Sequence, residues 1–193
     1  MTATLTPAGS EQVTPEPAAH DPLVVGVDLS LASTGIAWAR GDNLVTDTLR
    51  GIGTGVPRLR QLAKAVREGC RTADLVVLEG PAYGSNTPGS NERAGLRWMV
   101  LERLWIDGRF VVEVAPATVK VYATGKGSHP GLGKGPMVEA ATRRYPAVQT
   151  GGSDNEVDAL WLAALGLDHL TGRHVVPQTH RRALASVPWP EVA

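Results

Sequence analysis

The sequence predicts an α/β protein whose mixed five-stranded sheet is flanked by helices. Apolar runs near the start of the chain are separated only by short turns, which is typical of antiparallel strands. Later apolar runs alternate with amphipathic stretches of helical spacing, which is typical of parallel strands joined by helices. A hairpin followed by this alternation predicts one mixed sheet covered by helices.

Five strands are expected, and two of them end on a carboxylate. Their ranges are residues 23–28, 34–40, 44–49, 74–79 and 110–114. The turn Gly41-Asp42-Asn43 joins the second strand to the third and predicts a hairpin. The first strand ends on Asp28 and the fourth on Glu79.

Five helices are expected as well. Their ranges are residues 57–71, 91–106, 116–123, 136–145 and 154–169. Pro57, Pro116 and Pro136 open three of them, because the first turn of a helix does not need the missing N–H. Ser153 stands where the cap of the last helix is expected, and Glu156 would complete a capping box.

The remaining segments predict loops and tails around a domain of residues 22–171. Residues 1–21 are rich in Thr, Pro, Ala and Glu and predict a disordered tail. Residues 80–90 and 125–135 are glycine-rich and predict loops, and the second of these is also basic. Residues 172–193 carry prolines without periodicity and predict a tail or an extended arm.

Length and composition exclude several protein classes. The 193 residues suit one domain with tails. No apolar run reaches the roughly 18 residues of a membrane-spanning helix, and the start of the chain lacks the pattern of a secretory signal. A single cysteine, Cys70, allows no internal disulfide and no zinc site made of cysteines. We therefore expect a cytoplasmic protein with no membrane partner.

The charge pattern is more informative than the net charge, which is zero. Two segments are rich in basic residues: Arg58, Arg60, Lys64, Arg67 and Arg71 in the first, and Lys120, Lys126, Lys134, Arg143 and Arg144 in the second. Each segment fits either a solvated helix face or a patch that contacts phosphates around an acidic centre.

Three acids are placed so that they could meet. Asp28 and Glu79 end strands, and Asp158 lies one turn into the last helix. Clustered carboxylates raise one another's pKa unless cations neutralise them, and hard oxygen ligands favour Mg²⁺ or Mn²⁺. Two such ions about 3.5–4 Å apart can activate water and stabilise a leaving oxygen. Phosphodiester hydrolysis is the chemistry that this pattern indicates.

Four segments carry a resemblance to a known family. They are Gly26-Val27-Asp28-Leu29-Ser30, Val77-Leu78-Glu79-Gly80, Asp154 to Leu160, and Val114 to Lys120 followed by Thr124-Gly125-Lys126-Gly127. Together they resemble RuvC-type Holliday junction resolvases, which have the ribonuclease H-like fold. Each motif alone is weak, but their order and spacing make the set specific. The resemblance covers about residues 23–170.

The resemblance implies a magnesium site, in which Mn²⁺ can substitute. Asp28, Glu79 and Asp158 would be catalytic metal ligands. The family places Asp or His three residues before the last Asp, where this chain has Asn155. Asp154 shares a helix face with Asp158 and is favoured as the fourth ligand, with the neutral Asn155 as the alternative.

Each acid also has a structural interpretation. Asp28 could cap the tight turn that follows it. Glu79 could be a solvated strand end, and Asp154 and Glu156 could stabilise the helix N-terminus. Asp158 precedes an apolar helix face, so surface exposure is not expected there.

The resemblance also implies residues that contact DNA. Tyr83, in the loop after Glu79, would stack on bases near the crossover, a contact worth about 1–3 kcal/mol, unless it is an ordinary loop tyrosine. The basic residues Lys120, Lys126 and Lys134 are candidates for phosphate contacts. Arg143 and Arg144 could serve phosphates or solvent, and no role is expected for His129.

Two tryptophans on the second predicted helix bear on oligomeric state. Trp98 and Trp105 lie seven residues apart, with Leu101 and Leu104 near them. This spacing predicts a stripe in the core or in a dimer interface. A homodimer would suit a four-way junction, which offers two related strands.

The sequence therefore predicts a Mg²⁺-dependent endonuclease that resolves Holliday junctions in branched DNA of a bacterial cell or a phage-infected host. One alternative is a nuclease that also cuts flaps and forks, and another is a non-catalytic DNA-binding domain of the same fold. A sugar- or acetate-kinase-like ATPase is disfavoured, because Ser30 replaces the second glycine of its first motif.

Overall fold

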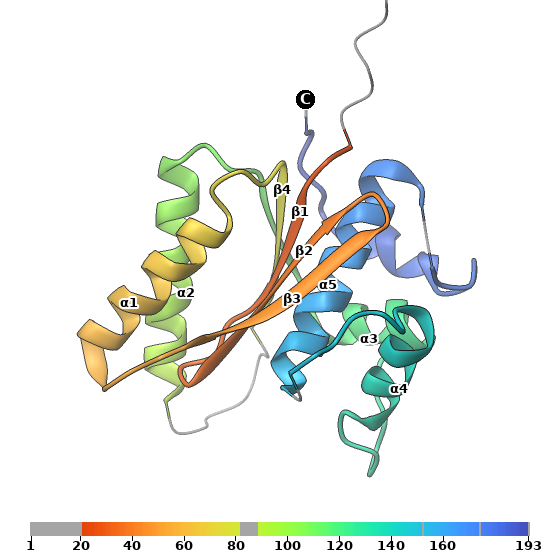
Figure 1. Ribbon diagram of the computed structural model, residues 1–193, viewed down its shortest axis with the longest axis horizontal. Helices are drawn as coiled ribbons and strands as arrows, with labels where there is room; N and C mark the ends of the chain where they lie inside the picture. Colours follow the sequence, from red (N-terminus) through yellow and green to blue (C-terminus); the bar gives the residue numbers. More distant parts are fainter. Residues whose placement is uncertain (1–20, 82–88, 152, 174, 193) are drawn as a thin grey trace, which may run out of the picture.

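The five strands form one mixed sheet in the order β3-β2-β1-β4-β5 (Figure 1). This computed structural model describes residues 21–81, 89–151, 153–173 and 175–192. The strands are β1 (Val24–Asp28), β2 (Ser33–Arg40), β3 (Asn43–Arg50), β4 (Leu75–Glu79) and β5 (Val111–Val114). Strands β1, β2 and β3 are antiparallel neighbours, whereas β4 runs parallel to β1 and β5 parallel to β4.

Helices cover both faces of the sheet (Figure 1). One face carries α1 (Gly55–Gly69) and α2 (Ser90–Ile106). The other carries α3 (Pro116–Thr124), α4 (Gly135–Arg144) and α5 (Asp154–Thr171). Because both faces are buried, β1 and β4 are apolar along nearly their whole length instead of alternating. The predicted mixed sheet flanked by helices is confirmed.

Helix α5 lies very close to the sheet because two glycines face its backbone. A Cβ atom at residue 26 would lie 2.1 Å from the carbonyl oxygen of Ala159, and one at residue 35 would lie 2.0 Å from that of Asn155. Only glycine leaves room for this backbone-to-backbone approach. The close approach brings the first turns of α5 to the end of β1 and the start of β2, where Asp28 pairs with Gly35.

The predicted capping box at the start of α5 is wrong. Ser153 occupies the N-cap position but makes no hydrogen bond to the helix through its side chain. Glu156 instead accepts hydrogen bonds from the hydroxyls of Thr46 and Thr48 on β3 and from the backbone N–H of Gly151. Hydrogen bonds from β3 therefore replace the capping contact that the local sequence predicts for Glu156. Elsewhere, helix ends differ from the predicted ones by about two residues, as at Gly55.

The segment after α5 packs against the domain. It contains a 3₁₀ helix, η1 (Arg181–Ser186), beside α3, and Val176, Ala183 and Val187 join the core. The guanidinium group of Arg181 donates to the fully buried carboxylate of Asp168 at 2.7 Å. The hydroxyl of Tyr122 donates to the same carboxylate at 3.1 Å. These contacts connect the C-terminal segment to α3 and α5.

The tryptophan stripe on α2 is not in the core. Leu104 is fully buried, but the residue exposures of Trp98 and Trp105 are 64% and 79%. The core interpretation of these two tryptophans is therefore wrong, and the interpretation as an interface between copies stays a prediction. Within the described ranges, no helix combines the length and apolar character needed to cross a membrane.

Candidate active site

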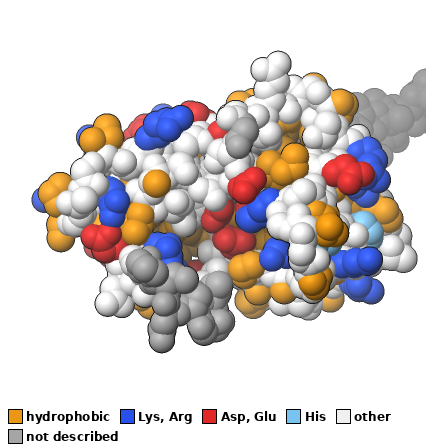
Figure 2. All heavy atoms as spheres, turned by 90° about the horizontal axis from the view of Figure 1, so that it is seen from below, with side chains coloured by type: hydrophobic (Ala, Val, Ile, Leu, Met, Phe, Trp, Pro, Cys, Tyr) orange, Lys and Arg blue, Asp and Glu red, His pale blue; other side chains and the backbone are white. Residues whose placement is uncertain are grey.

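The ends of two adjacent parallel strands place Asp28 and Glu79 side by side. Val24 to Val27 of β1 pair in register with Leu75 to Leu78 of β4, so the next residue of each strand is the acid. The N-terminus of α5 reaches the same edge of the sheet. Figure 2 views this end of the molecule and shows Asp and Glu side chains beside Lys and Arg side chains near the middle of the face.

Burial and mutual repulsion make ionisation of this carboxylate pair unfavourable. Asp28 is only 7% exposed. Its pKa is raised well above the ordinary value, first by burial, then by the charge of Glu79 and a hydrogen bond with it. Burial also raises the pKa of Glu79, although its hydrogen bond with Asp28 and the charges of Lys134 and Lys120 oppose that shift. The pair therefore favours a bound proton or cation.

Asp158 is a third acid, contributed by α5, and a lysine is its ion-pair partner. It is 2% exposed and lies on the second turn of α5. The ammonium group of Lys134 forms an ion pair with its Oδ2 atom. Among the described residues this oxygen accepts no hydrogen bond of regular geometry. Because the charge of Lys134 also acts on Asp28 and Glu79, one ammonium group serves three carboxylates.

The chemistry of this donor set fits a hard divalent cation. In the described part of the chain, no group of three or more His, Cys, Asp or Glu side chains is arranged closely enough to hold a metal ion. In this structure, the positive charge beside Asp158 comes from the ammonium group of Lys134. The Asp28–Glu79 pair, which resists ionisation, and the buried Oδ2 atom of Asp158, which lacks a regular hydrogen bond, are nevertheless oxygen donors of the kind that Mg²⁺ prefers.

The two candidates for a fourth ligand lie on the first turn of α5. Asp154 is exposed. The side-chain amide of Asn155 donates to the backbone carbonyl of Ser33 at 2.6 Å and lies 3.3 Å from the Ser33 hydroxyl. Asn155 therefore anchors α5 to the start of β2. Asp154 as the fourth ligand stays a prediction.

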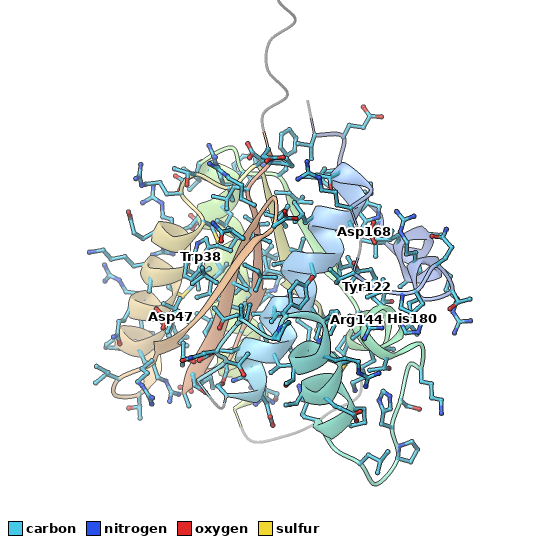
Figure 3. The ribbon with its side chains drawn as sticks, turned by 45° about the vertical axis from the view of Figure 1, so that its right-hand side comes forward. Trp38, Asp47, Tyr122, Arg144, Asp168 and His180 are labelled. Carbon is cyan, nitrogen blue, oxygen red and sulfur yellow. The ribbon has the colours of Figure 1, made fainter. Side chains whose placement is uncertain are left out.

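The predicted DNA-contacting residues divide into two groups. The charges of Lys120 and Lys134 act on Glu79, so both lie close to the acidic centre. Arg143 pairs with Glu139 at 2.7 Å, and Arg144 donates to the carbonyl of Val175 at 2.8 Å, beside the C-terminal segment (Figure 3).

Three further predictions concern exposed or undescribed positions. Lys126 is exposed in the loop after α3. His129, for which no role was expected, lies 3.0 Å from the Thr124 hydroxyl and helps to order that loop. Tyr83 lies outside the described residues.

The first basic segment is largely engaged in ion pairs. Arg67 of α1 donates to both carboxylate oxygens of Asp107, at 2.6 and 2.7 Å. Arg58 pairs with Glu92 of α2. These contacts join α1 to the two ends of α2, which favours a structural role for this segment.

A cleft beside the acid pair contains residues that the sequence interpretation missed. It has a volume of about 410 Å³, and its lining includes Asp28, Glu79, Ser90, Arg93, Ala94 and Arg97. The four α2 residues follow helical spacing and therefore form one face. That spacing was visible in the sequence, but the side of α2 that turns toward the acids is set by the packing of α2 on the sheet.

Comparison with solved structures identifies the architecture. Thermus thermophilus RuvC matches with a TM-score of 0.58 and 17% sequence identity over 78% of this chain and 96% of RuvC. T. thermophilus RuvC in complex with Holliday junction substrate gives a TM-score of 0.60 and 14% identity over the same shares. Fowlpox virus resolvase in complex with substrate Holliday junction DNA matches with a TM-score of 0.57 and 13% sequence identity, over 77% of this chain and 99% of the resolvase.

The chain has the RuvC-type, ribonuclease H-like fold. It spans nearly the whole length of these resolvases, and about a fifth of its residues lie outside the match. The predicted resemblance is thus confirmed for the fold. No protein-family model and no curated protein sequence matches the chain.

Proposed function

We propose that this protein is a metal-dependent endonuclease that resolves Holliday junctions by phosphodiester hydrolysis. The observation that supports this most directly is the acid pair at the ends of adjacent parallel strands, in which Asp28 is buried, together with the buried Asp158 of α5. Solved structures of the same fold include two resolvases bound to junction DNA. We expect the protein to act in the cytoplasm of a bacterial cell or a phage-infected host.

In the proposed reaction, Asp28, Glu79 and Asp158 hold Mg²⁺ or Mn²⁺. Asp154 would be the fourth ligand. Bound metal would supply a nucleophilic hydroxide near neutral pH and neutralise charge on the phosphate. The rigid attachment of α5 through Gly26 and Gly35 keeps Asp158 at a fixed place relative to the strand ends.

The two lysines at the acidic centre would act on the substrate. Lys134 balances the carboxylate charge and, with Lys120, would donate hydrogen bonds to phosphate oxygens when DNA is bound. Such donors stabilise the negative charge that develops during hydrolysis. Lys126, Arg143 and Arg144 would contact phosphates farther from the reaction, and Tyr83 would stack on a base near the crossover.

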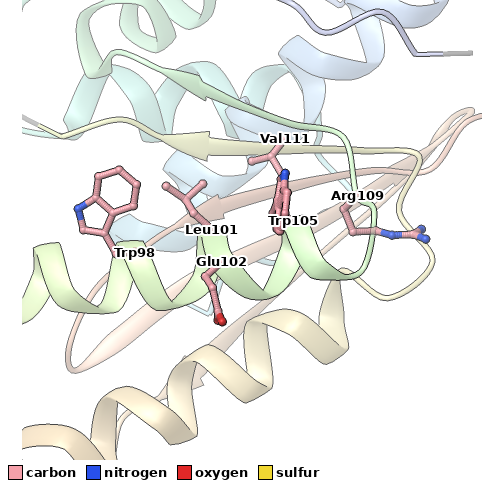
Figure 4. Close-up of a pocket in the computed structure, with 6 residues that line it drawn as sticks. All are labelled: Trp98, Leu101, Glu102, Trp105, Arg109 and Val111. Carbon is pink, nitrogen blue, oxygen red and sulfur yellow. The ribbon is translucent and has the colours of Figure 1, made fainter.

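A second copy of the chain is the proposed partner at α2. Figure 4 shows Trp98, Leu101 and Trp105 along one side of α2, next to Val111 of β5. These side chains line a mainly apolar cavity of about 410 Å³. Exposed aromatic patches of this kind mark interaction sites, and a twofold dimer would present two active sites to a four-way junction.

A panel of labelled DNA substrates tests this function. Wild-type protein and Asp158→Asn are compared on a four-way junction, a flap, a fork and a linear duplex in Mg²⁺. The proposal predicts paired cuts in the junction and no cutting by the variant. Equal cutting of flaps and forks would indicate a broader branch-specific nuclease. Junction binding without cutting would indicate a non-catalytic DNA-binding domain.

A further inference from the structure

The cleft beside the acid pair has two walls of opposite charge. Asp28 and Glu79 line it from the sheet, and Ser90, Arg93, Ala94 and Arg97 line it from α2. Its volume of about 410 Å³ is within the range of about 300–1,000 Å³ that is usual for ligand sites. Carboxylates alone would repel a DNA phosphate, so the arginine wall is the side of the cleft that suits the DNA backbone.

The two arginines of this wall lie one turn apart on α2. Arg97 forms a two-pronged ion pair with Glu113 of β5, and its guanidinium group lies 5.0 Å from the ring centre of Trp98. Arg93 lies one turn closer to the start of α2, at the end of the helix nearest the acid pair, and it is half-buried.

The start of α2 adds to the positive potential of this wall. Its N-cap residue is Gly89, which has a φ of 81° and no side chain with which to cap the helix. Backbone N–H groups at a helix N-terminus favour anions. Arg93 and the N-terminus of α2 would therefore both attract an anion in the cleft.

We propose that Arg93 binds a phosphate of the DNA backbone in this cleft, across from the carboxylates. This inference rests on the proposed function in taking branched DNA as the ligand. Guanidinium groups bind phosphate oxygens through two parallel hydrogen bonds, which fixes the position of the strand as well as adding affinity. Arg93 would thereby position the strand that is to be cut.

The test measures which phosphates of the DNA backbone contribute to binding by each protein variant. Junctions that carry one neutral methylphosphonate, moved step by step through the crossover, are bound in Ca²⁺ by wild type, Arg93→Gln and Arg93→Lys. Arg60→Gln is the control, because Arg60 is exposed on α1. The thermal midpoint of each variant shows that it is folded.

The proposal predicts one phosphate near the crossover at which neutralisation weakens wild-type binding about tenfold. Arg93→Gln should bind the unmodified junction about tenfold more weakly and lose sensitivity at that phosphate, and its salt slope should fall by about 1. Arg93→Lys should recover part of the affinity, and Arg60→Gln should behave as wild type.

Two results would overturn the assignment: Arg93→Gln keeps the wild-type sensitivity at every phosphate, or Arg60→Gln shows the same loss as Arg93→Gln. Cleavage in Mg²⁺ is scored separately. A wild-type protein that shows the predicted interference but cuts nothing would support the role of Arg93 and contradict the nuclease proposal. A wild-type protein that binds no branched DNA would contradict both.

Discussion

At Asp28 and Glu79 the fold keeps two carboxyl groups where ionisation is unfavourable. Burial raises the pKa of both groups, and the charge of Glu79 raises that of Asp28 further. The folded protein therefore binds protons at this pair more tightly than the unfolded chain does. The stabilisation from that proton binding is present at acid pH and is lost as the pH rises through the folded-state pKa. At neutral pH the pair opposes folding, which is typical of functional sites.

Asp28→Asn is predicted to stabilise the protein when no divalent cation is present. Removing one carboxylate relieves the repulsion, and a gain of about 1 kcal/mol corresponds to a rise of roughly 2–4 °C in Tm. The gain should be present at neutral pH and shrink toward pH ~4, where free carboxyl groups bind protons. Thermal unfolding across this pH range in EDTA measures it. A lower Tm for the variant at neutral pH would contradict this account of the pair.

Lys134→Met is predicted to have the opposite effect on stability. The substitution leaves Asp158 without its ion-pair partner and removes the cation that serves all three carboxylates. We expect the Tm in EDTA to fall by about 2–4 °C, and Mg²⁺ to restore more of it than it adds to wild type. Lys126→Met, at an exposed lysine of the same loop, is the control. Equal shifts for the two variants would show that Lys134 has no special part in charge balance.

At the scale of the elements, the contact between α5 and the sheet determines the geometry of the site. All residues from Glu156 to Asp168 are buried, and Asp158 is fixed by the position of the helix rather than by a flexible loop. Gly26 and Gly35 set that position because their missing side chains admit the helix backbone. The geometry of the candidate active site therefore depends on two residues that have no functional side chain.

Gly26→Ala is predicted to move α5 away from β1. The added methyl group would lie 2.1 Å from the Ala159 carbonyl oxygen, so the backbones must separate, at a cost of about 1–3 kcal/mol or more. Chemical denaturation measures the loss, and junction cleavage should fall with it because Asp158 moves. Gly95→Ala on α2 is the control, since its methyl would meet only Leu59 at 3.6 Å and alanine favours the helix. Unchanged stability of Gly26→Ala would refute the close contact.

At the scale of the whole molecule, the acids lie at one end of the sheet, and the exposed tryptophans of α2 lie next to Val111 of β5. Trp105 is the most exposed large apolar residue of the described chain, at 79%. A twofold axis near α2 would bury it and place two equivalent acidic centres in one particle.

Trp105→Gln is predicted to weaken self-association. Loss of an aromatic anchor at an interface costs about 2 kcal/mol or more, which is roughly a 30-fold weaker dimer. Sedimentation over a range of concentrations measures the dissociation constant. Ile52→Gln, at an exposed residue after β3, should leave it unchanged. A wild-type protein that is monomeric at all concentrations would contradict the proposed dimer.

The fold and the proximity of Asp28 and Glu79 could be predicted from the sequence. Apolar runs reveal the strands, and neighbouring parallel strands end at the same end of the sheet. Contacts that depend on the path of a loop or the rotation of a helix could not be predicted. The ion pair of Lys134 with Asp158 and the position of Arg93 are of this kind. Glu156 was assigned to a cap because its partners on β3 are more than 100 residues away.

Mapped cleavage of a labelled four-way junction tests the central claim most directly. Wild-type protein and Asp28→Asn are incubated with the junction in Mg²⁺, in Mn²⁺ and in EDTA, and the cuts are located on all four strands. We predict symmetric cuts on two opposing strands with either metal, none in EDTA, and none by Asp28→Asn although it still binds the junction. Wild-type cutting in EDTA, or undiminished cutting by Asp28→Asn, would contradict the assignment of a metal-dependent resolvase site.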